Sequence, residues 1–289
     1  SSSLKMYLMN KFTNIILPNF LEPCYTDDLM RVGKDNDGGY LVSLEDITKS
    51  DLLISIGISF DWSFEKRFKA INKEIIIFTY DGSVGFKYFV KNIKYHLKNF
   101  LSKPSTIGFS KLTRRIKMLI DFSIFFRFNI LKSKIFHEES FVDSNMDSDY
   151  LASFSKYYGY DPKTIGKNYM FEKIINNTFL SIDIEGSEYG LLEDIVHYQQ
   201  YISGMVIEFH DVHENLEKIE FFIRNFKLNL LHLHINNFAD VISGLPSVIE
   251  LTFSKYSEIS KDKAALLPHK FDQPNTEKGP SFNVSFAKV

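Results

Sequence analysis

The sequence predicts an α/β fold, built on a mostly parallel β-sheet with helices on both of its faces. Short apolar segments alternate with longer segments of helical periodicity, which is the pattern of repeated strand–helix–strand units. Several of the apolar segments end abruptly in an acid, a glycine or a histidine, and residues 178–185 are the clearest case. Parallel strands bring such residues to one edge of the sheet, where α/β proteins bind their ligands.

Composition limits the possible classes of protein. The 289 residues, 44% of them hydrophobic, suffice for one domain spanning 1–289, with 1–50 as an N-terminal extension and 86–130 as a helical insertion. A net charge of -2 gives no reason to expect nucleic acid as a partner. The single Cys24 excludes an internal disulfide framework. No secretory signal is visible and no segment reaches the roughly 20 apolar residues that span a bilayer, so we expect a cytoplasmic protein without a transmembrane segment.

The N-terminal part begins with an irregular or helical lead-in over 4–30, interrupted by Pro18 and Pro23. Residues 31–42 contain an Asp-Gly-Gly turn between apolar residues, which predicts a β-hairpin. This hairpin is either purely structural or a lid near a ligand. The basic, Phe-rich helices expected within 86–130 either pack on the core or contact a membrane surface or a lipid-linked acceptor.

The first strand–helix–strand unit has two features that suit an adenosine-bearing ligand. Its first strand, within 51–60, breaks at Gly57, where the missing Cβ lets a ligand approach and the following backbone N–H groups can meet it. The next strand, 74–80, ends in Asp81, whose carboxylate can accept from ribose hydroxyls. A full G-x-G-x-x-G pattern is absent, which argues against a dinucleotide enzyme.

The later strands also end in polar residues. The expected strands are 133–137, 178–183, 204–211 and 230–235, with 248–253 and 281–286 as closing antiparallel strands, and a polar helical region extends from the first of them to about Gly159. His210 is the first catalytic candidate, because it lies at a strand end between Glu208 and Asp211. His232 and His234 share one strand face and are expected in the core or behind the site. Asn236 and Asn237 either cap a turn or bind a polyhydroxylated acceptor.

Taken together, the motifs resemble those of FkbM-like S-adenosylmethionine-dependent methyltransferases over nearly the whole chain. The motifs are DGGY at 37–40, Ser-Ile-Gly at 55–57, Tyr-Asp-Gly at 80–82, Ile-Asp-Ile-Glu-Gly-Ser-Glu at 182–188, Ile-Glu-Phe-His-Asp at 207–211 and His-Ile-Asn-Asn at 234–237. The first turn departs from the fuller acidic, glycine-rich turn of many methyltransferases, since Asp61 lies beyond it.

The resemblance implies a class I methyltransferase sheet of seven strands and S-adenosylmethionine as the cofactor. It implies that Gly57 approaches the cofactor, that Asp81 holds the ribose and that Glu138 and Glu139 flank the adenine. The implied cofactor-binding set is Gly57, Ser59, Phe60, Asp81, Gly82, Glu139 and Asp183. The implied activity is O-methylation of a sugar hydroxyl in bacterial capsule, lipopolysaccharide or natural-product assembly. The partner is then a small-molecule or glycan acceptor, with homo-oligomerisation left open.

Two catalytic arrangements follow from the polar strand ends. In one, His210 is a general base oriented by Glu208 or Asp183. In the other, Asp183, His210 and Asp211 hold Mg²⁺ or Mn²⁺, which lowers the pKa of the acceptor hydroxyl. The acceptor-binding candidates are Asp37, Tyr40, Glu185, Asn236 and Asn237. A nicotinamide-dependent oxidoreductase and a non-catalytic binding module on a degenerate methyltransferase fold are the alternative functions.

Overall fold

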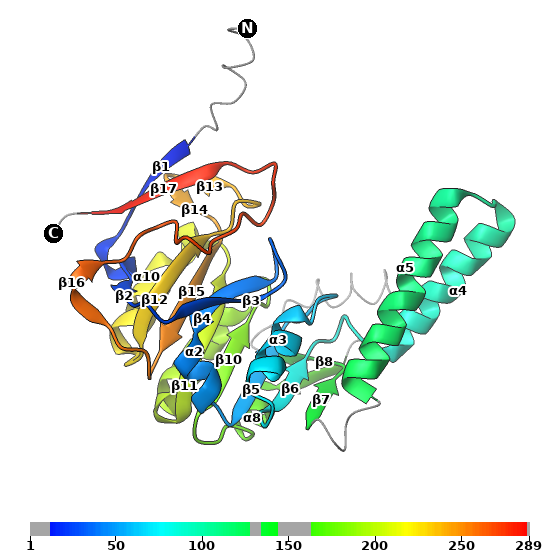
Figure 1. Ribbon diagram of the computed structural model, residues 1–289, viewed down its shortest axis with the longest axis horizontal. Coiled ribbons are helices and arrows are strands. Elements are labelled where there is room, and N and C mark those ends of the chain that lie inside the picture. The colour runs from blue at the N-terminus through cyan, green and yellow to red at the C-terminus, as the bar shows by residue number, and fades with distance from the viewer. Residues whose placement is uncertain (1–11, 128–133, 144–162, 288–289) are drawn as a thin grey trace, which may run out of the picture.

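A seven-stranded sheet forms the centre of the protein in the computed structural model, which describes residues 12–127, 134–143 and 163–287. The strand order is β12-β15-β11-β10-β5-β6-β7 (Figure 1). β15 runs antiparallel to both of its neighbours, and the other six strands are parallel to one another. The bounds are β5 Leu52–Ile56, β6 Ile76–Tyr80, β7 Ile135–Glu138, β10 Thr178–Ile182, β11 Ile202–Phe209, β12 Asn229–Ile235 and β15 Ile249–Ser254.

The order in which the chain builds this sheet creates a ligand site. From β5 in the middle the chain adds β6 and β7 on one side, returns to β10, and then adds β11 and β12 on the other side. β15 comes last and inserts between β11 and β12. This is the class I methyltransferase fold, as the sequence predicts. The reversal between β5 and β10 is a topological switch point, and sheets of this kind bind ligands beyond the carboxyl ends of their strands there.

Both faces of the sheet are buried, because alternate residues of its strands enter two separate cores. Along β10, Phe179 belongs to one core, while Leu180 and Ile182 belong to the other. Phe68 of α3 covers the first face and Phe222 of α10 covers the second. This double burial explains why the strands are continuously apolar instead of alternating with polar residues. The helices flanking the sheet are α2 Leu44–Lys49, α3 Ser63–Ile71, α8 Lys167–Phe171, α9 Leu192–Tyr198 and α10 Val212–Asn225, with 3-10 turns at Asn19–Leu21, Glu188–Leu191 and Gln199–Tyr201.

The predicted hairpin is present as β3, Leu29–Gly33, paired antiparallel with β4, Gly39–Ser43. Its turn places Asn36 and Gly38 in the left-handed region, with φ of 63° and 85°. Smaller pairs of strands surround the main sheet. They are β2 Cys24–Tyr25 with β16 Ser260–Ala264, β8 Ser140–Asp143 with β9 Lys163–Gly166, and β13 Val241–Ile242 with β14 Leu245–Pro246.

Two predictions about the chain ends were wrong. Within the expected lead-in over 4–30, β1 (Phe12–Leu17) is a strand that stops just before Pro18. Residues 281–286 do form a strand, β17 (Ser281–Phe286), but it pairs in parallel with β1 and not with the main sheet. Local alternation predicts a strand but does not identify its partner. The helical region expected up to Gly159 lies mostly outside the described residues.

Two long helices, α4 (Phe86–Ser102) and α5 (Thr106–Phe122), form a helical hairpin that projects from the body (Figure 1). Pro104 lies in the turn between them, and the Ser105 hydroxyl accepts from the Gly108 N–H at the start of α5. Five π-helical residues, Ser123–Arg127, follow α5. Trp62 fixes the base of the hairpin, because its ring lies 5.7 Å from the rings of both Phe122 and Phe126. Within the described ranges, no helix combines the length and apolar character needed to cross a bilayer.

Candidate functional site

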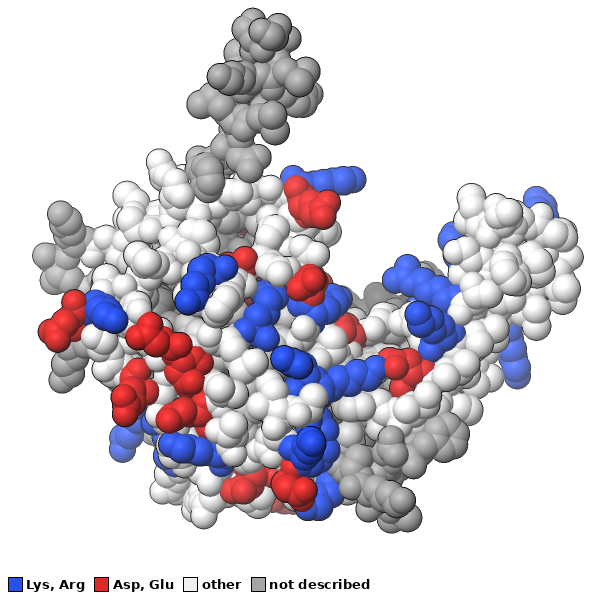
Figure 2. Space-filling model, in the orientation of Figure 1, with Lys and Arg blue, Asp and Glu red and all other residues white. Residues whose placement is uncertain are grey.

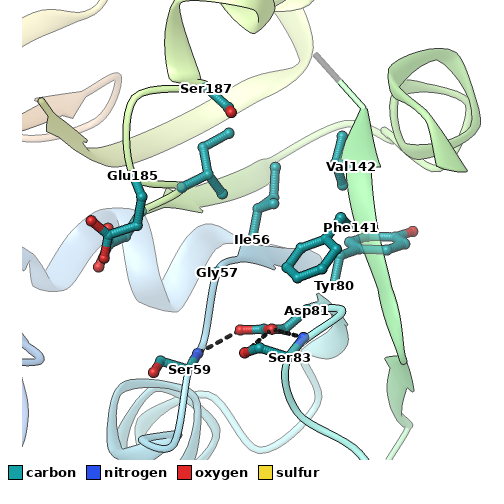
Figure 3. Close-up of a pocket in the computed structure, with 12 residues that line it drawn as sticks. Ile56, Gly57, Ser59, Tyr80, Asp81, Ser83, Phe141, Val142, Glu185 and Ser187 are labelled. Atoms are coloured by element: carbon teal, nitrogen blue, oxygen red, sulfur yellow. Dashed lines mark hydrogen bonds between the residues drawn. The ribbon is translucent and has the colours of Figure 1, made fainter. Parts of the chain in front are cut away.

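A cavity of about 360 Å³ opens where β5, β6 and β10 end (Figure 3). Its walls come from the turns after these strands and from β8. The lining residues are Ile56, Gly57, Ser59, Tyr80, Asp81, Ser83, Phe141, Val142, Asp183, Ile184, Glu185 and Ser187. Four of the seven predicted cofactor-binding residues, namely Gly57, Ser59, Asp81 and Asp183, therefore line one cavity.

Gly57 is required by the protein itself. Its φ is +80°, and a Cβ at this position would lie 1.6 Å from the backbone oxygen of Asp183. The sequence predicts that the missing Cβ lets a ligand approach, but in the structure a Cβ at this position would meet the backbone at the end of the neighbouring strand β10. The consequence is that the turn after β5 lies directly against the turn after β10, so both contribute to the same cavity.

Asp81 ties two turns together through its carboxylate. Its Oδ2 accepts from the Ser59 N–H at 2.6 Å, and its Oδ1 accepts from both the N–H and the hydroxyl of Ser83, at 2.7 and 2.6 Å. A carboxylate offers about four acceptor positions. These contacts leave room on Oδ2 for about one further donor, such as a ligand hydroxyl.

Three of the predicted cofactor-binding residues lie elsewhere. Phe60 packs on the ring of Tyr88, with 4.9 Å between ring centroids. Glu139 accepts from the Phe86 N–H at the start of α4 and does not line the cavity. Gly82 faces the ring of Phe141, which would lie 2.4 Å from an added Cβ.

Phe141 and Val142 of β8 line the cavity beyond β6 and were not foreseen. β8 pairs with β9 outside the main sheet. The order of strands along the chain does not reveal that β8 returns to this position.

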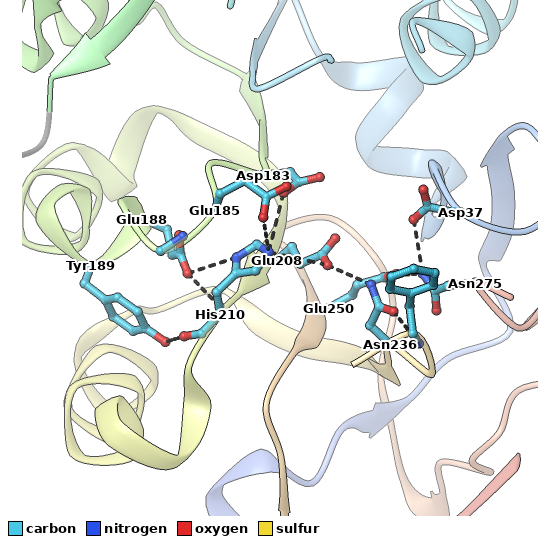
Figure 4. A network of polar contacts seen from close by, with 12 residues as sticks. Asp37, Asp183, Glu185, Glu188, Tyr189, Glu208, His210, Asn236, Glu250 and Asn275 are labelled. Atoms are coloured by element: carbon cyan, nitrogen blue, oxygen red, sulfur yellow. Dashed lines mark hydrogen bonds and ion pairs between the residues drawn. The ribbon is translucent and has the colours of Figure 1, made fainter. Parts of the chain in front are cut away.

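His210 lies at the centre of a cluster of acids beside the cavity (Figure 4). Its Nε2 is 3.5 Å from Glu185 Oε2, 3.9 Å from Asp183 Oδ1 and 3.8 Å from Glu208 Oε1. Its Nδ1 is 3.4 Å from Glu188 Oε1. Because Asp183 also lines the cavity, the imidazole and the cavity share one wall.

Glu188 is the most deeply buried acid of this cluster, with no exposed surface. Its Oε1 accepts from the His210 N–H at 2.6 Å and its Oε2 from the Gly186 N–H at 2.8 Å. The neighbouring Tyr189 hydroxyl donates to the His210 carbonyl. In the sequence, Glu188 is the last residue of the motif at 182–188 and is not among the candidate site residues. One of its two partners, the His210 N–H, lies 22 positions away in the sequence, so the local sequence gives no signal of this role.

The predicted metal-ligand set needs a correction. Asp183, Glu185 and His210 each offer one ligand atom within 4.8 Å of the others, and among the described residues Asp211 does not belong to such a group. Asp211 instead occupies the position before α10 with φ of 49°, and its carbonyl accepts from the N–H groups of Glu214 and Asn215. The left-handed backbone at this position is consistent with its side chain not joining the cluster.

Across the neighbouring strands the acid cluster continues to Glu208 and Glu250, which face each other in β11 and β15. Asn236 donates to Glu208 Oε1 at 2.9 Å, and Asn275 donates to Glu250 Oε1 at 2.9 Å. Asn275 also lies 3.4 Å from Asp37 of the β3–β4 hairpin. The hairpin is therefore linked to the acid cluster through one amide.

The other acceptor-binding candidates divide into two groups. Burial raises the pKa of the Tyr40 hydroxyl, and the charges of the nearby Asp183 and Glu208 raise it further. Asn237 is engaged elsewhere, since its amide donates to the carbonyls of Thr276 and Pro280 and accepts from the Thr276 N–H. The structure therefore brings Tyr40 to the cluster, but not Asn237.

Burial and charge shift the titration of the cluster. Burial raises the pKa of Asp183 to about 7, although 33% of its side chain remains exposed. The charge of His210 opposes this shift, and the charges of Glu185 and Glu250 add to it. Burial also raises the pKa of Glu208, and the nearby Asp183 raises it further. For His210, burial lowers the pKa, but Glu188 and Asp183 outweigh it and the net shift is upward. The titrations of Asp183 and His210 are therefore linked, because the charge of each shifts the pKa of the other.

His232 and His234 lie behind the site, as predicted. Asp272 contacts both rings, 2.9 Å from His232 Nε2 and 3.5 Å from His234 Nδ1. Burial, the largest contribution, lowers the pKa of His234, but Glu250 and Asp272 outweigh it and raise the pKa to about 9. These side chains attach the C-terminal segment to β12 and do not line the cavity.

Comparisons with known proteins find no matching family model and no matching curated protein. Among solved structures, the fibrillarin pre-rRNA processing protein of Methanococcus jannaschii is 8% identical, covering 72% of this chain and 68% of its own, with a TM-score of 0.34. Precorrin-6y C5,15-methyltransferase from Geobacter metallireducens is 8% identical, covering 73% and 85%, with a TM-score of 0.33. The fold assignment rests on the strand order of this chain, and the FkbM-like resemblance stays a prediction.

Proposed function

We propose that this protein is an S-adenosylmethionine-dependent O-methyltransferase whose acceptor is a sugar hydroxyl. The observation that carries the proposal is the position of Asp183, which lines the switch-point cavity and also faces His210 at 3.9 Å. A cofactor in the cavity and an acceptor beside the imidazole would then meet at one wall. The sugar and its setting in capsule, lipopolysaccharide or natural-product assembly follow from the sequence resemblance alone. The cytoplasmic location remains the expectation drawn above from the sequence.

The cavity has the size and the polar groups that this cofactor needs. Its volume of about 360 Å³ falls within the roughly 300–1,000 Å³ typical of small-molecule sites. Asp81 keeps about one acceptor position for a ribose hydroxyl, and the partly exposed ring of Phe141 offers apolar surface for adenine. When bound, S-adenosylmethionine supplies an electrophilic methyl group.

The residues of this chain then have to orient the acceptor and take up its proton. His210 Nε2 lies 3.5 Å from the exposed Glu185, while the buried Glu188 lies 3.4 Å from Nδ1 on the other side of the imidazole and holds the His210 backbone N–H. The neutral imidazole would accept the hydroxyl proton at Nε2. The developing imidazolium lies close to Asp183 and Glu185, whose negative charge stabilises it.

A second arrangement uses a divalent cation held by Asp183, Glu185 and His210. The observation in its favour is that these three residues place ligand atoms within 4.8 Å of one another. Two carboxylates and an imidazole suit Mn²⁺ or Mg²⁺. Bound there, the cation would supply Lewis acidity for the acceptor hydroxyl.

Calorimetry with S-adenosylhomocysteine and with NAD tests the cofactor class. We expect the first to bind, and Asp81→Ala to weaken it about tenfold or more, because a charge-assisted hydrogen bond contributes about 1.5–3 kcal/mol. Binding of NAD alone would favour the oxidoreductase. Binding of neither ligand would favour the non-catalytic module.

Turnover with a sugar acceptor tests the catalytic cluster. His210→Ala should lower the turnover by a factor of about 10²–10⁴ while S-adenosylhomocysteine still binds. Activity lost in EDTA and restored by Mn²⁺ or Mg²⁺ supports the cation arrangement, whereas full activity in EDTA supports the base. Full activity of His210→Ala would eliminate both.

A further inference from the structure

The helical hairpin and the residues after it carry a charge opposite to that of the remaining chain. Residues 86–127 contain ten Lys and Arg residues and one acid, Asp121, although the whole chain has a net charge of -2. Asp121 is already paired, because both of its oxygens accept from Lys66 of α3, at 2.5 and 2.6 Å. Figure 2 shows blue side chains gathered on the side of the hairpin that faces the body.

Four of the ten cations, Lys91, Lys111, Arg114 and Arg115, line a cavity of about 660 Å³ between α4, α5 and Phe60, which we call the hairpin cleft. Lys111, Arg114 and Arg115 come from α5, and Tyr88 and His96 come from α4. None of the residues that line the cleft is acidic. Arg115 lies over the Phe60 ring, with 5.7 Å between the guanidinium carbon and the ring centroid.

The electrostatic environment of the cleft is visible at His96. Burial lowers the pKa of this imidazole, and the charges of Arg115 and Lys111 lower it further. A cationic cleft without a carboxylate in its wall favours an anionic ligand. Guanidinium groups match phosphate oxygens in pairs, and the rings of Phe60, Tyr88 and Tyr95 offer surfaces on which a base or sugar can stack.

The hairpin cleft lies next to the proposed cofactor cavity. Ser59 lines the cavity and the following residue, Phe60, lines the cleft. The Ser59 N–H is held by Asp81, so the segment between the two sites has a fixed anchor. The walls of the two sites are therefore joined by the peptide bond between Ser59 and Phe60.

We propose that the hairpin cleft binds the phosphate or diphosphate group of the acceptor, so that the acceptor is an activated, phosphate-linked sugar and not a free sugar. The role as acceptor site rests on the proposed methyltransferase function, whereas the anion site itself does not. A volume of about 660 Å³ accommodates a nucleoside diphosphate, since drug-sized ligands occupy sites of roughly 300–1,000 Å³.

Equilibrium binding of inorganic pyrophosphate to the full chain at low ionic strength tests the site. Lys111→Ala/Arg114→Ala should weaken pyrophosphate binding about tenfold or more and make it less dependent on salt. The matched control is Lys98→Ala/Lys117→Ala, which removes one charge from each helix at exposed positions outside the cleft, and should change the affinity less than about twofold. Equal losses in both double variants, or no pyrophosphate binding by the unaltered chain, would overturn the proposal.

Further ligands identify the source of the phosphate. Tighter binding of uridine diphosphate than of pyrophosphate supports a nucleotide-linked sugar, and tighter binding of a short prenyl diphosphate supports a lipid-linked one. If the chain binds only anionic vesicles or an oligonucleotide, and both double variants lose this binding equally, the proposed phosphate site is wrong and the hairpin is a general basic surface. S-Adenosylhomocysteine binding is measured on the same samples. If it fails while pyrophosphate binds through the cleft, the anion site stands and the methyltransferase proposal falls.

Discussion

Glu188→Gln tests what the buried carboxylate contributes beside His210, the proposed catalytic base. Both carboxylate oxygens of Glu188 accept backbone N–H groups, from His210 at 2.6 Å and from Gly186 at 2.8 Å. Glutamine has nearly the same shape, but one of its terminal atoms is a donor and would face one of these two N–H groups. The loss of one charge-assisted hydrogen bond in a fully buried position should lower the free energy of unfolding by about 1.5–3 kcal/mol.

Thermal and denaturant unfolding measure this loss, which corresponds to about 2–4 °C in Tm for each kcal/mol in a domain of this size. The matched control is Glu185→Gln. It makes the same chemical change 3.5 Å from the same imidazole, but its side chain is 77% exposed and should leave Tm almost unchanged. A Glu188→Gln protein as stable as the Glu185→Gln protein would refute the argument.

The same variant has a kinetic signature. Glu188 is the largest contribution that raises the pKa of His210 against the lowering effect of burial. Without its charge the pKa of His210 falls, so the limb of the pH–rate profile that reports the base should shift to lower pH. An unchanged limb would mean that His210 is not the group that limits the rate.

Two further predictions concern stability. Gly57→Ala should lower the free energy of unfolding by about 3 kcal/mol or more, because φ is +80° and the new Cβ would lie 1.6 Å from the Asp183 carbonyl oxygen. Gly166→Ala is the control in the same denaturant unfolding, because φ is -62° and no described atom beyond its chain neighbours lies within 4 Å of the added Cβ, so its stability should not change. Burial raises the pKa of Glu65 from 4.5 to about 7, so the folded state retains a proton that the unfolded chain releases, and stability falls as pH rises from about 4.5 through 7. The difference in unfolding free energy between Glu65→Gln and the unaltered chain should therefore shift by about 3 kcal/mol in favour of the variant from pH 4 to pH 8. Denaturant unfolding at the two pH values measures this shift, and Glu45→Gln, at a side chain that is 45% exposed, is the control that should show none.

The main sheet could be predicted because burial on both faces forces continuous apolar runs, and each run ends where the chain leaves the sheet. Gly57, Asp81, Asp183 and His210 were found at strand ends for this reason, and the structure places them around one site. Their positions follow from the order of parallel strands.

Contacts that join distant segments could not be predicted. Glu188 depends on a strand 22 positions away, and Phe141 reaches the cavity through a strand outside the main sheet. Glu139 was expected beside the cofactor, but it accepts instead from the Phe86 N–H at the start of α4. A single sequence shows the side chains but not these partners. It predicts the basic helices within 86–130, but not that Phe60 lines a cleft together with them.

The parallel pairing of β1 with β17 joins the first and the last strands of the described residues. Asn14 and Asn283, which are hydrogen-bonded across this pair, are 269 positions apart in sequence. Contacts of such long range form late and slow the closure of a fold. β1 precedes β17 by most of the described chain, and until β17 has formed, the edge that β1 uses for this pairing is open to pairing with another chain. A cut that removes either strand leaves this edge of the other strand unpaired, so the two strands share one vulnerability to truncation and to aggregation.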